Sequence, residues 1–274
     1  PARAPRERDS SVPSPGAPPR PMQRSITRRR FAAALGLAAA APLAARLAAS
    51  GTLAAETGSP GGAPVVVELF TSQGCNSCPP ADRYLGELAT RPDVIPLAYH
   101  VDYWDYIGWK DPWADPSFTE RQRAYAPLLG RSTIYTPQMV VAGRDHAVGS
   151  HRAKVESLLQ TLRPQSGQVR VTLTAEQALL EGALPDGMAE AQVLAAIYLS
   201  RADTAVARGE NAGKTLAEYN IVRELASLGA FEGGTRSYPL DLGLGEGRDA
   251  FAVIVQHVPS GAILGAAKRE PGGS

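Results

Sequence analysis

Two cysteines stand three positions apart as Cys75-Asn76-Ser77-Cys78, and the 274-residue sequence has no others. A short apolar run precedes the pair and a helical pattern follows it, so the dithiol is predicted to lie at a helix N-terminus. Unpaired N–H groups and the positive end of the helix dipole stabilise a thiolate there. A thiolate is the attacking species in disulfide exchange. The pattern predicts thiol–disulfide chemistry, with Cys75 as the exposed nucleophile and Cys78 as the resolving thiol.

Two other uses of the cysteines stay open. A structural disulfide is common in exported proteins, although a loop this short removes little entropy from the unfolded chain. Alternatively, Cys75, Cys78 and a histidine could bind a soft ion such as Cu(I), with His100 as the first candidate for the third ligand. The redox interpretation needs no cofactor beyond the disulfide itself, whereas this alternative needs copper.

Residues 65–163 are interpreted as an α/β domain that begins with a strand. The run at 65–70 is almost continuously apolar, which is typical of a strand buried on both faces. The pattern then predicts a helix at 81–90, a strand at 94–101 that contains Pro96, strands at 138–142 and 146–148, and a last helix capped by Ser150.

An aromatic-rich insertion at 103–130 interrupts this domain and holds all three tryptophans of the chain. Its first part, 103–113, either lines a groove beside the dithiol, with Tyr103 and Trp104 as candidates, or packs as a small satellite core. Asp115 and Pro116 have the residue types of a helix N-cap and a first helical residue. The aspartates at 102, 105, 111 and 115 lack metal-ligand spacing and are interpreted as turn and cap residues.

The segment Phe70-Thr-Ser-Gln-Gly-Cys-Asn-Ser-Cys-Pro-Pro-Ala-Asp82 resembles the hallmark of a family of uncharacterised secreted bacterial proteins with a thioredoxin-like fold. Three further segments are similar to its other signatures: His100-Val-Asp-Tyr-Trp-Asp105, Tyr135-Thr-Pro-Gln138 and Gly209-Glu-Asn211. The resemblance covers the chain from about Val65 onward. It implies the fold and export, and it implies no assigned activity.

The same resemblance gives a role to Pro137, which directly precedes a predicted strand. In thioredoxin-like folds a cis-proline at this place faces the dithiol and presents backbone to an extended substrate. Pro137 is therefore a candidate for orienting the partner chain. Asn76, Ser77 and Thr136 are candidate groove residues beside it.

Beyond residue 163 the pattern changes, and residues 164–274 are predicted to form a mostly β C-terminal unit. Residues 168–174 alternate between polar and apolar types, 192–199 form an apolar run, and 251–256 are rich in β-branched and apolar residues. Glycine and proline separate these segments, which is typical of short strands. The segment 209–215 resembles a phosphate-binding loop, but its first glycine is one residue too close to the second. A hairpin turn is the preferred interpretation there.

The N-terminal part reads as an export leader. Residues 1–21 are rich in Pro, Ser and Arg, and they are either disordered or upstream of a start at Met22. Residues 22–55 resemble a twin-arginine signal peptide, because Arg28-Arg29-Arg30-Phe31 precedes an Ala-rich run. Residues 56–64 form a Gly/Pro-rich linker. We expect an exported protein, periplasmic or extracellular.

Loss of the leader changes the charge balance. Residues 1–55 contain nine arginines and two acidic residues, so the remainder has 19 basic and 25 acidic side chains. A mildly acidic chain is a poor nucleic-acid binder. Pro42 and Arg46 interrupt the apolar run, so no stable membrane span is expected once the leader is removed. The expected partners are proteins or small thiols and disulfides.

Overall fold

The first strand, β1 (Val65–Thr71), consists of seven consecutive buried residues, as its apolar run predicted. The computed structural model describes residues 63–163 and 169–270. The expected disordered segment, the signal peptide and nearly all of the linker lie outside these ranges, and so does the predicted boundary at 163/164.

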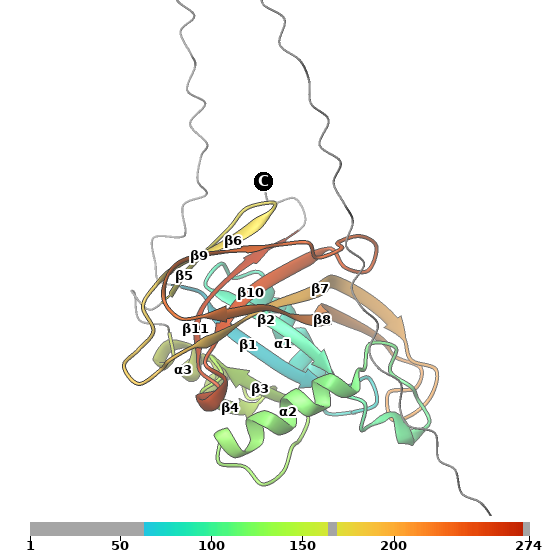
Figure 1. Ribbon diagram of the computed structural model, residues 1–274. Coiled ribbons are helices and arrows are strands. Elements are labelled where there is room, and N and C mark those ends of the chain that lie inside the picture. The colour runs from blue at the N-terminus through green and yellow to red at the C-terminus, as the bar shows by residue number, and fades with distance from the viewer. Residues whose placement is uncertain (1–62, 164–168, 271–274) are drawn as a thin grey trace, which may run out of the picture. The chain divides into compact units, whose positions relative to one another are not determined.

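Eleven strands and three α-helices follow one another along the described chain (Figure 1). The helices are α1 (Pro79–Ala89), α2 (Pro116–Leu128) and α3 (Arg152–Thr161), and short 3-10 turns lie at Asp105–Ile107 and Val258–Ser260. The other strands are β2 (Val94–His100), β3 (Gln138–Val141), β4 (Asp145–Val148), β5 (Val169–Leu173), β6 (Gln177–Gly182), β7 (Ala191–Ala205), β8 (Thr215–Phe231), β9 (Gly234–Pro239), β10 (Ala250–Gln256) and β11 (Ile263–Arg269).

A mixed eight-stranded sheet, in the order β11-β10-β7-β8-β2-β1-β3-β4, forms the framework. Strands β1 and β2 are parallel and are connected through α1, whereas β3 runs antiparallel to β1 with Gln138 opposite Phe70. A mostly β C-terminal part was predicted, and its strands are present. Four of them complete the same sheet, and β5, β6 and β9 form a second, three-stranded sheet.

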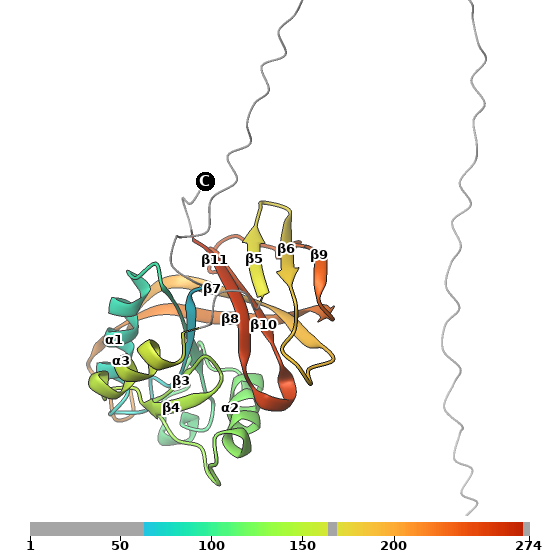
Figure 2. The ribbon, with the colours of Figure 1, turned by 90° about the vertical axis from the view of Figure 1, so that its left-hand side faces the viewer.

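Alternating side chains of β1 serve two different cores. Val65, Val67 and Leu69 pack against α1 and α3 on one face, where Figure 2 shows these two helices side by side. Val66 and Phe70 face the opposite core, to which α2 contributes Phe118 and Tyr125. Because β1 is covered on both faces, the loop that follows it starts from a rigid element.

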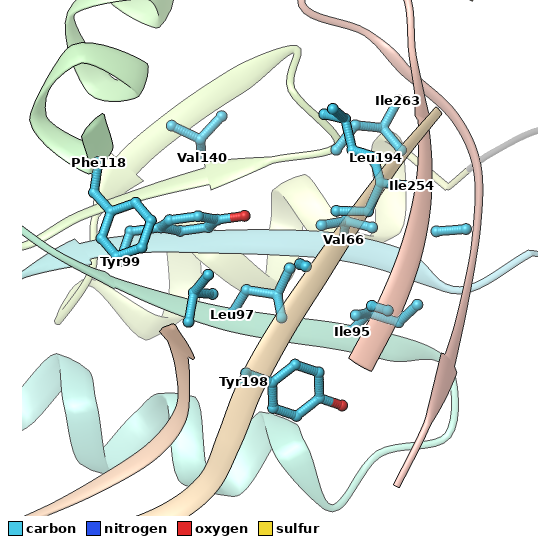
Figure 3. Close-up of a cluster of buried hydrophobic side chains, with 14 of the residues drawn as sticks. Val66, Ile95, Leu97, Tyr99, Phe118, Val140, Leu194, Tyr198, Ile254 and Ile263 are labelled. Carbon is cyan, nitrogen blue, oxygen red and sulfur yellow. The ribbon is translucent and has the colours of Figure 1, made fainter. Parts of the chain in front are cut away.

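The second core is enclosed because the sheet curls until β11 approaches the β3–β4 turn. The backbone N–H of Ile263 donates to the carbonyl of Ala142 at 3.0 Å. Gly143 has a φ of 64°, and a Cβ placed on it would lie 1.9 Å from the carbonyl oxygen of Gly261. Only glycine fits this approach. Figure 3 shows Phe118 of α2, Val140 of β3 and Ile263 of β11 among the side chains of this core.

The expected strand that contains Pro96 is present as β2. The adjacent strand β8 pairs with it only at Ile221 with Ala98, and Asn220 donates its side-chain amide to the Pro96 carbonyl at 2.8 Å. The prediction that Ser150 caps α3 is wrong. The helix begins after His151, the N-cap, whose carbonyl accepts the N–H groups of Lys154 and Val155. Among the described residues, no helix combines the length and apolarity that a membrane crossing requires.

Candidate functional site

The two cysteines lie in the loop 72–78, here called the cysteine loop, between β1 and α1. They form a disulfide with a Cα–Cα distance of 5.4 Å. The N-cap of α1 is Cys78, because its carbonyl accepts the N–H groups of Ala81 and Asp82. Prolines fill the first two helical positions, where missing N–H groups cost little.

Both sulfur-bearing residues are buried, which corrects the expectation of an exposed Cys75. Cys75 is 1% exposed and Cys78 is 0% exposed. Asn76 and Ser77, which separate them, are exposed, and the Ser77 hydroxyl lies 3.3 Å from the Cys75 sulfur. The surface beside the disulfide is therefore made by these two residues and by the loops around them.

The segment that precedes β3 lies close to the cysteine loop. The Thr136–Pro137 peptide bond is cis and Pro137 is buried. Since Gln138 pairs with Phe70, Pro137 stands beside the end of β1. The indole N–H of Trp104 donates to the Thr136 hydroxyl at 2.7 Å, and a Cβ placed on Gly74 would lie 3.0 Å from the Trp104 Cβ. One tryptophan thus connects the two segments.

The aromatic loop 103–113 is mainly packed inward, and one of its rings is open to solvent. Trp109 donates its indole N–H to the side chain of Gln73 at 2.8 Å. Tyr103 lies beside Trp104 and donates to Gln122 of α2. Tyr106 stacks on Trp104 and is 81% exposed. The inward contacts of Tyr103 and Trp109 fit the satellite-core interpretation, and a groove beside the dithiol stays a prediction.

The turn between β7 and β8, residues 206–214, also contacts the cysteine loop. The side-chain amide of Asn211, a fully buried residue, donates to the carbonyls of Gln73 and Cys75 at 2.9 and 3.0 Å. The carboxylate of Glu210 accepts the N–H of Asn76 at 3.2 Å. The preferred hairpin interpretation of this segment is confirmed, because β-strands flank it on both sides.

A buried group of acids and a histidine, here called the buried acid–histidine cluster (His100, Asp111 and Glu218), lies behind the cysteine loop. The His100 Nδ1 atom lies 2.7 Å from the Asp111 carboxylate, and its Nε2 atom lies 3.8 Å from Glu218. Gln73 attaches the loop to the cluster, because its backbone N–H donates to Asp111 and its side chain donates to both oxygens of Glu218.

Burial and charge shift the protonation of this cluster. Burial alone lowers the pKa of His100, but Asp111 and Glu218 outweigh it and raise that pKa to about 9. Burial tends to raise the pKa of Asp111, but the His100 imidazolium lowers it below its ordinary value. Burial raises the pKa of Glu218. We therefore assign a protonated His100 beside an ionised Asp111.

Asp82 adds another buried carboxyl, one helical turn after Cys78. Its N–H bonds to the Cys78 carbonyl, and its side chain accepts the Thr71 hydroxyl at 2.8 Å. Burial raises the pKa of Asp82 from 3.8 to about 7, although His100 and Thr71 oppose the change. Near neutral pH this carboxyl therefore exists in both protonation states.

Sequence reasoning missed several of these residues or assigned them a lesser role. Asp111 was interpreted as a turn residue, and it does accept the N–H of Trp113 at 2.9 Å, but its main partners are Gln73 and His100. Glu218 carried no signal of its own. One sequence feature could have identified Asp82, Gln73 and Asn211 as site residues: each lies within a segment that resembles a family signature.

The alternative metal set of Cys75, Cys78 and His100 is not assembled as such. Within residues 63–163 and 169–270, no three His, Cys, Asp or Glu side chains are placed to hold a metal ion. The His100 ring is committed to the acid–histidine cluster, since Asp111 bonds its Nδ1 atom and Glu218 lies near its Nε2 atom. Copper binding by the reduced thiols stays a prediction.

Comparisons with known proteins give a family but no activity. A family model described as "Protein of unknown function (DUF1223)" matches residues 66–256. The crystal structure of a structural-genomics target from Agrobacterium tumefaciens is 32% identical, with a TM-score of 0.68 over 79% of this chain and 97% of that chain. HBP35 of Porphyromonas gingivalis is 15% identical over 78% of each chain, with a TM-score of 0.49, which is too distant for inference. No curated protein matches.

Proposed function

This chain belongs to the DUF1223 family of proteins of unknown function, and we propose that it is an exported thiol–disulfide oxidoreductase. We further propose that residues 65–163 form its thioredoxin-like domain, with the insertion at 103–130. One observation carries the proposal. The Cys75–Cys78 disulfide begins α1 beside the Pro137 segment and above buried ionisable groups. A disulfide placed only for stability needs no such surroundings.

The exchange would proceed in two balanced steps. In the reduced protein the Cys75 thiolate attacks one sulfur of a substrate disulfide, and the other substrate sulfur leaves as a thiolate. Cys78, after losing its proton, attacks the Cys75 sulfur and releases the second substrate thiolate. Two electrons pass to the substrate, and the protein ends as the Cys75–Cys78 disulfide. The reverse sequence oxidises a dithiol, so the reduction potential decides the direction.

Burial of both cysteines adds a requirement to this mechanism. In either direction the Cys75 sulfur must meet a sulfur atom of the substrate, so the cover over Cys75 has to open during each cycle. The parts of this cover near the surface are Ser77 and the contact between Glu210 and Asn76. Because that contact is exposed, it is inexpensive to break compared with the buried bonds of Asn211. We propose that opening begins there.

The test is the reduction potential of the Cys75–Cys78 pair. The mature protein is equilibrated in glutathione and dithiothreitol buffers, and free thiols are counted. A value between roughly −120 and −270 mV would support a working redox protein and indicate its direction. A value below about −300 mV would refute the oxidoreductase proposal, because such a disulfide resists reduction by the glutathione pool.

Burial of the disulfide favours a second candidate, an exported interaction module with an inert bond. That candidate gains if the potential falls below about −300 mV. Copper handling is a third option, and titration of the reduced protein with Cu(I) separates it from the others. Stoichiometric binding that is lost in Cys75→Ser would favour it.

Export by the twin-arginine route is tested by replacing Arg28 and Arg29 with lysine and locating the protein.

A further inference from the structure

A cavity of about 480 Å³ opens between the C-terminal half of α2 and residues 131–134. Two arginines, Arg123 and Arg131, line it together with the hydroxyl residues Ser132 and Thr133 and three apolar residues. None of the lining residues is acidic. We call this cavity the basic groove.

The two guanidinium groups of the groove remain available for a ligand. Among the described residues, no carboxylate forms an ion pair with Arg131, whose guanidinium lies 5.5 Å above the Tyr135 ring. Arg123 pairs with Glu120, but the two side chains are 56% and 68% exposed. An exposed pair of this kind contributes little and exchanges readily. The groove therefore presents positive charge and hydroxyl donors to solvent.

The groove adjoins the segment that leads to Pro137, which stands beside the end of β1. Residues 131–133 are exposed coil that leads into Tyr135, Thr136 and Pro137. The three residue-to-residue steps from Ile134 to Pro137 span at most about 11 Å. The Trp104 indole donates to Thr136, and its Cβ lies close to Gly74. A substrate that reacts at Cys75 and extends along this segment would reach the groove.

We infer that the basic groove selects substrates that carry a carboxylate a few residues from the reacting sulfur. This inference rests on the proposed function and names its substrate class, an acidic peptide thiol or disulfide. Arginine suits the task because its planar fork binds a carboxylate with two parallel hydrogen bonds. The carboxylate belongs either to an acidic side chain of a protein or to a small peptide thiol such as glutathione.

The test compares exchange rates for peptides that differ at one position. The reduced mature protein reacts with cysteine peptides activated as mixed disulfides, in which the residue three positions from the cysteine is Asp, Asn or Lys. Glutathione disulfide tests whether the carboxylate comes from a small peptide thiol. Reduction of the oxidised protein by dithiothreitol, which carries no carboxylate, measures disulfide exchange without carboxylate recognition. The variants are Arg123→Gln with Arg131→Gln, the same pair changed to lysine, and Arg236→Gln on β9 as an exposed control.

The wild type should react about tenfold faster with the Asp peptide than with the Lys peptide at low salt. This preference should fall below twofold in the double Gln variant and persist in part in the double Lys variant. It should remain unchanged in Arg236→Gln, and the rate of reduction by dithiothreitol should be the same in all variants. If the double Gln variant slows only the reaction with glutathione disulfide, the carboxylate that the groove binds belongs to the small thiol. An equal preference in the wild type and the double Gln variant would overturn the inference.

A binding measurement separates this inference from the proposed function. Labelled peptides with serine in place of cysteine cannot react, and their fluorescence anisotropy reports groove binding directly. Tighter binding of the Asp peptide that is lost in the double Gln variant supports the groove even if the disulfide is inert. The absence of any Asp preference overturns the groove even if exchange with dithiothreitol is fast. Circular dichroism confirms that each variant is folded.

Discussion

The side-chain amide of Asn211 donates to the carbonyl of Cys75 at 3.0 Å, across 136 residues of sequence. The same amide donates to the Gln73 carbonyl, and Asn211 is fully buried. Since buried carbonyls need partners, this one side chain satisfies two acceptors of the cysteine loop. The β7–β8 turn is therefore a structural part of the site, and the position of Cys75 depends on it.

Replacing Asn211 with alanine should loosen the cysteine loop. The two carbonyls lose their buried donor, which costs about 1–3 kcal/mol of stability. We expect the disulfide to be reduced several-fold faster by dithiothreitol, because opening of the loop becomes easier. Urea unfolding and reduction kinetics measure the two effects. Arg208→Ala, an exposed change in the same turn, is the matched control. Unchanged kinetics in Asn211→Ala would show that the turn does not restrain Cys75.

The two cysteines should differ in their ability to trap partners. In Cys78→Ser, Cys75 can form a mixed disulfide that no second thiol resolves, so adducts should accumulate. In Cys75→Ser, the remaining thiol belongs to the N-cap residue of α1, whereas the Cys75 sulfur of the wild type lies 3.3 Å from the hydroxyl of the exposed Ser77, so adducts should be scarce. Non-reducing gels and mass spectrometry of periplasmic extracts count them. Equal trapping by both variants would contradict the assignment of Cys75 as nucleophile.

Arg121 should be essential for stability rather than for chemistry. Its Nε atom donates to Glu68 at 2.7 Å, and Glu68 lies in the middle of β1 with 0% exposure. Arg121→Met leaves a buried charge without its cation, which we expect to destabilise the fold by about 3–5 kcal/mol. The double variant with Glu68→Gln should recover part of this loss. Urea denaturation followed by circular dichroism measures both, and a loss below 1 kcal/mol would contradict the prediction.

Local patterns predicted the elements that position the site. The apolar run gave β1, and Asp115 caps α2 by accepting the Ser117 N–H, as its residue type and place before Pro116 indicated. Both features depend on neighbours within a few residues, so spacing rules suffice. The expectation that Pro137 lies beside the cysteine loop came from the resemblance to thioredoxin-like folds and not from local spacing.

The features that the sequence analysis missed depend on contacts between residues that are far apart in the sequence. Cys75 is buried because Asn211 bonds its carbonyl and its loop packs on Trp104, and neither contact leaves a mark in the residues around Cys75. The acid–histidine cluster joins β2, the aromatic loop and β8, so Asp111 and Glu218 gain meaning only once the sheet is assembled. The misplaced cap at Ser150 has a local cause, since a serine near a helix start resembles a cap one residue too early.

The pH dependence of stability should reveal Asp82. Burial raises its pKa from 3.8 to about 7, so folding favours the protonated carboxyl. That contribution is complete below about pH 4 and disappears as the pH rises through about 7. His100, raised from 6.5 to about 9, contributes below pH 6.5 and loses its contribution as the pH rises through about 9.

Asp82→Asn replaces the carboxyl with a neutral group of the same shape that can still accept the Thr71 hydroxyl. The variant should therefore lose the decline between pH 4 and 7 while it keeps the later one from His100. At pH 8 it should exceed the wild type by about 1–4 kcal/mol, since a shift of three pKa units corresponds to about 4 kcal/mol. Urea unfolding from pH 4 to pH 9 measures both curves. Parallel curves would mean that Asp82 stays ionised in the folded protein throughout this range.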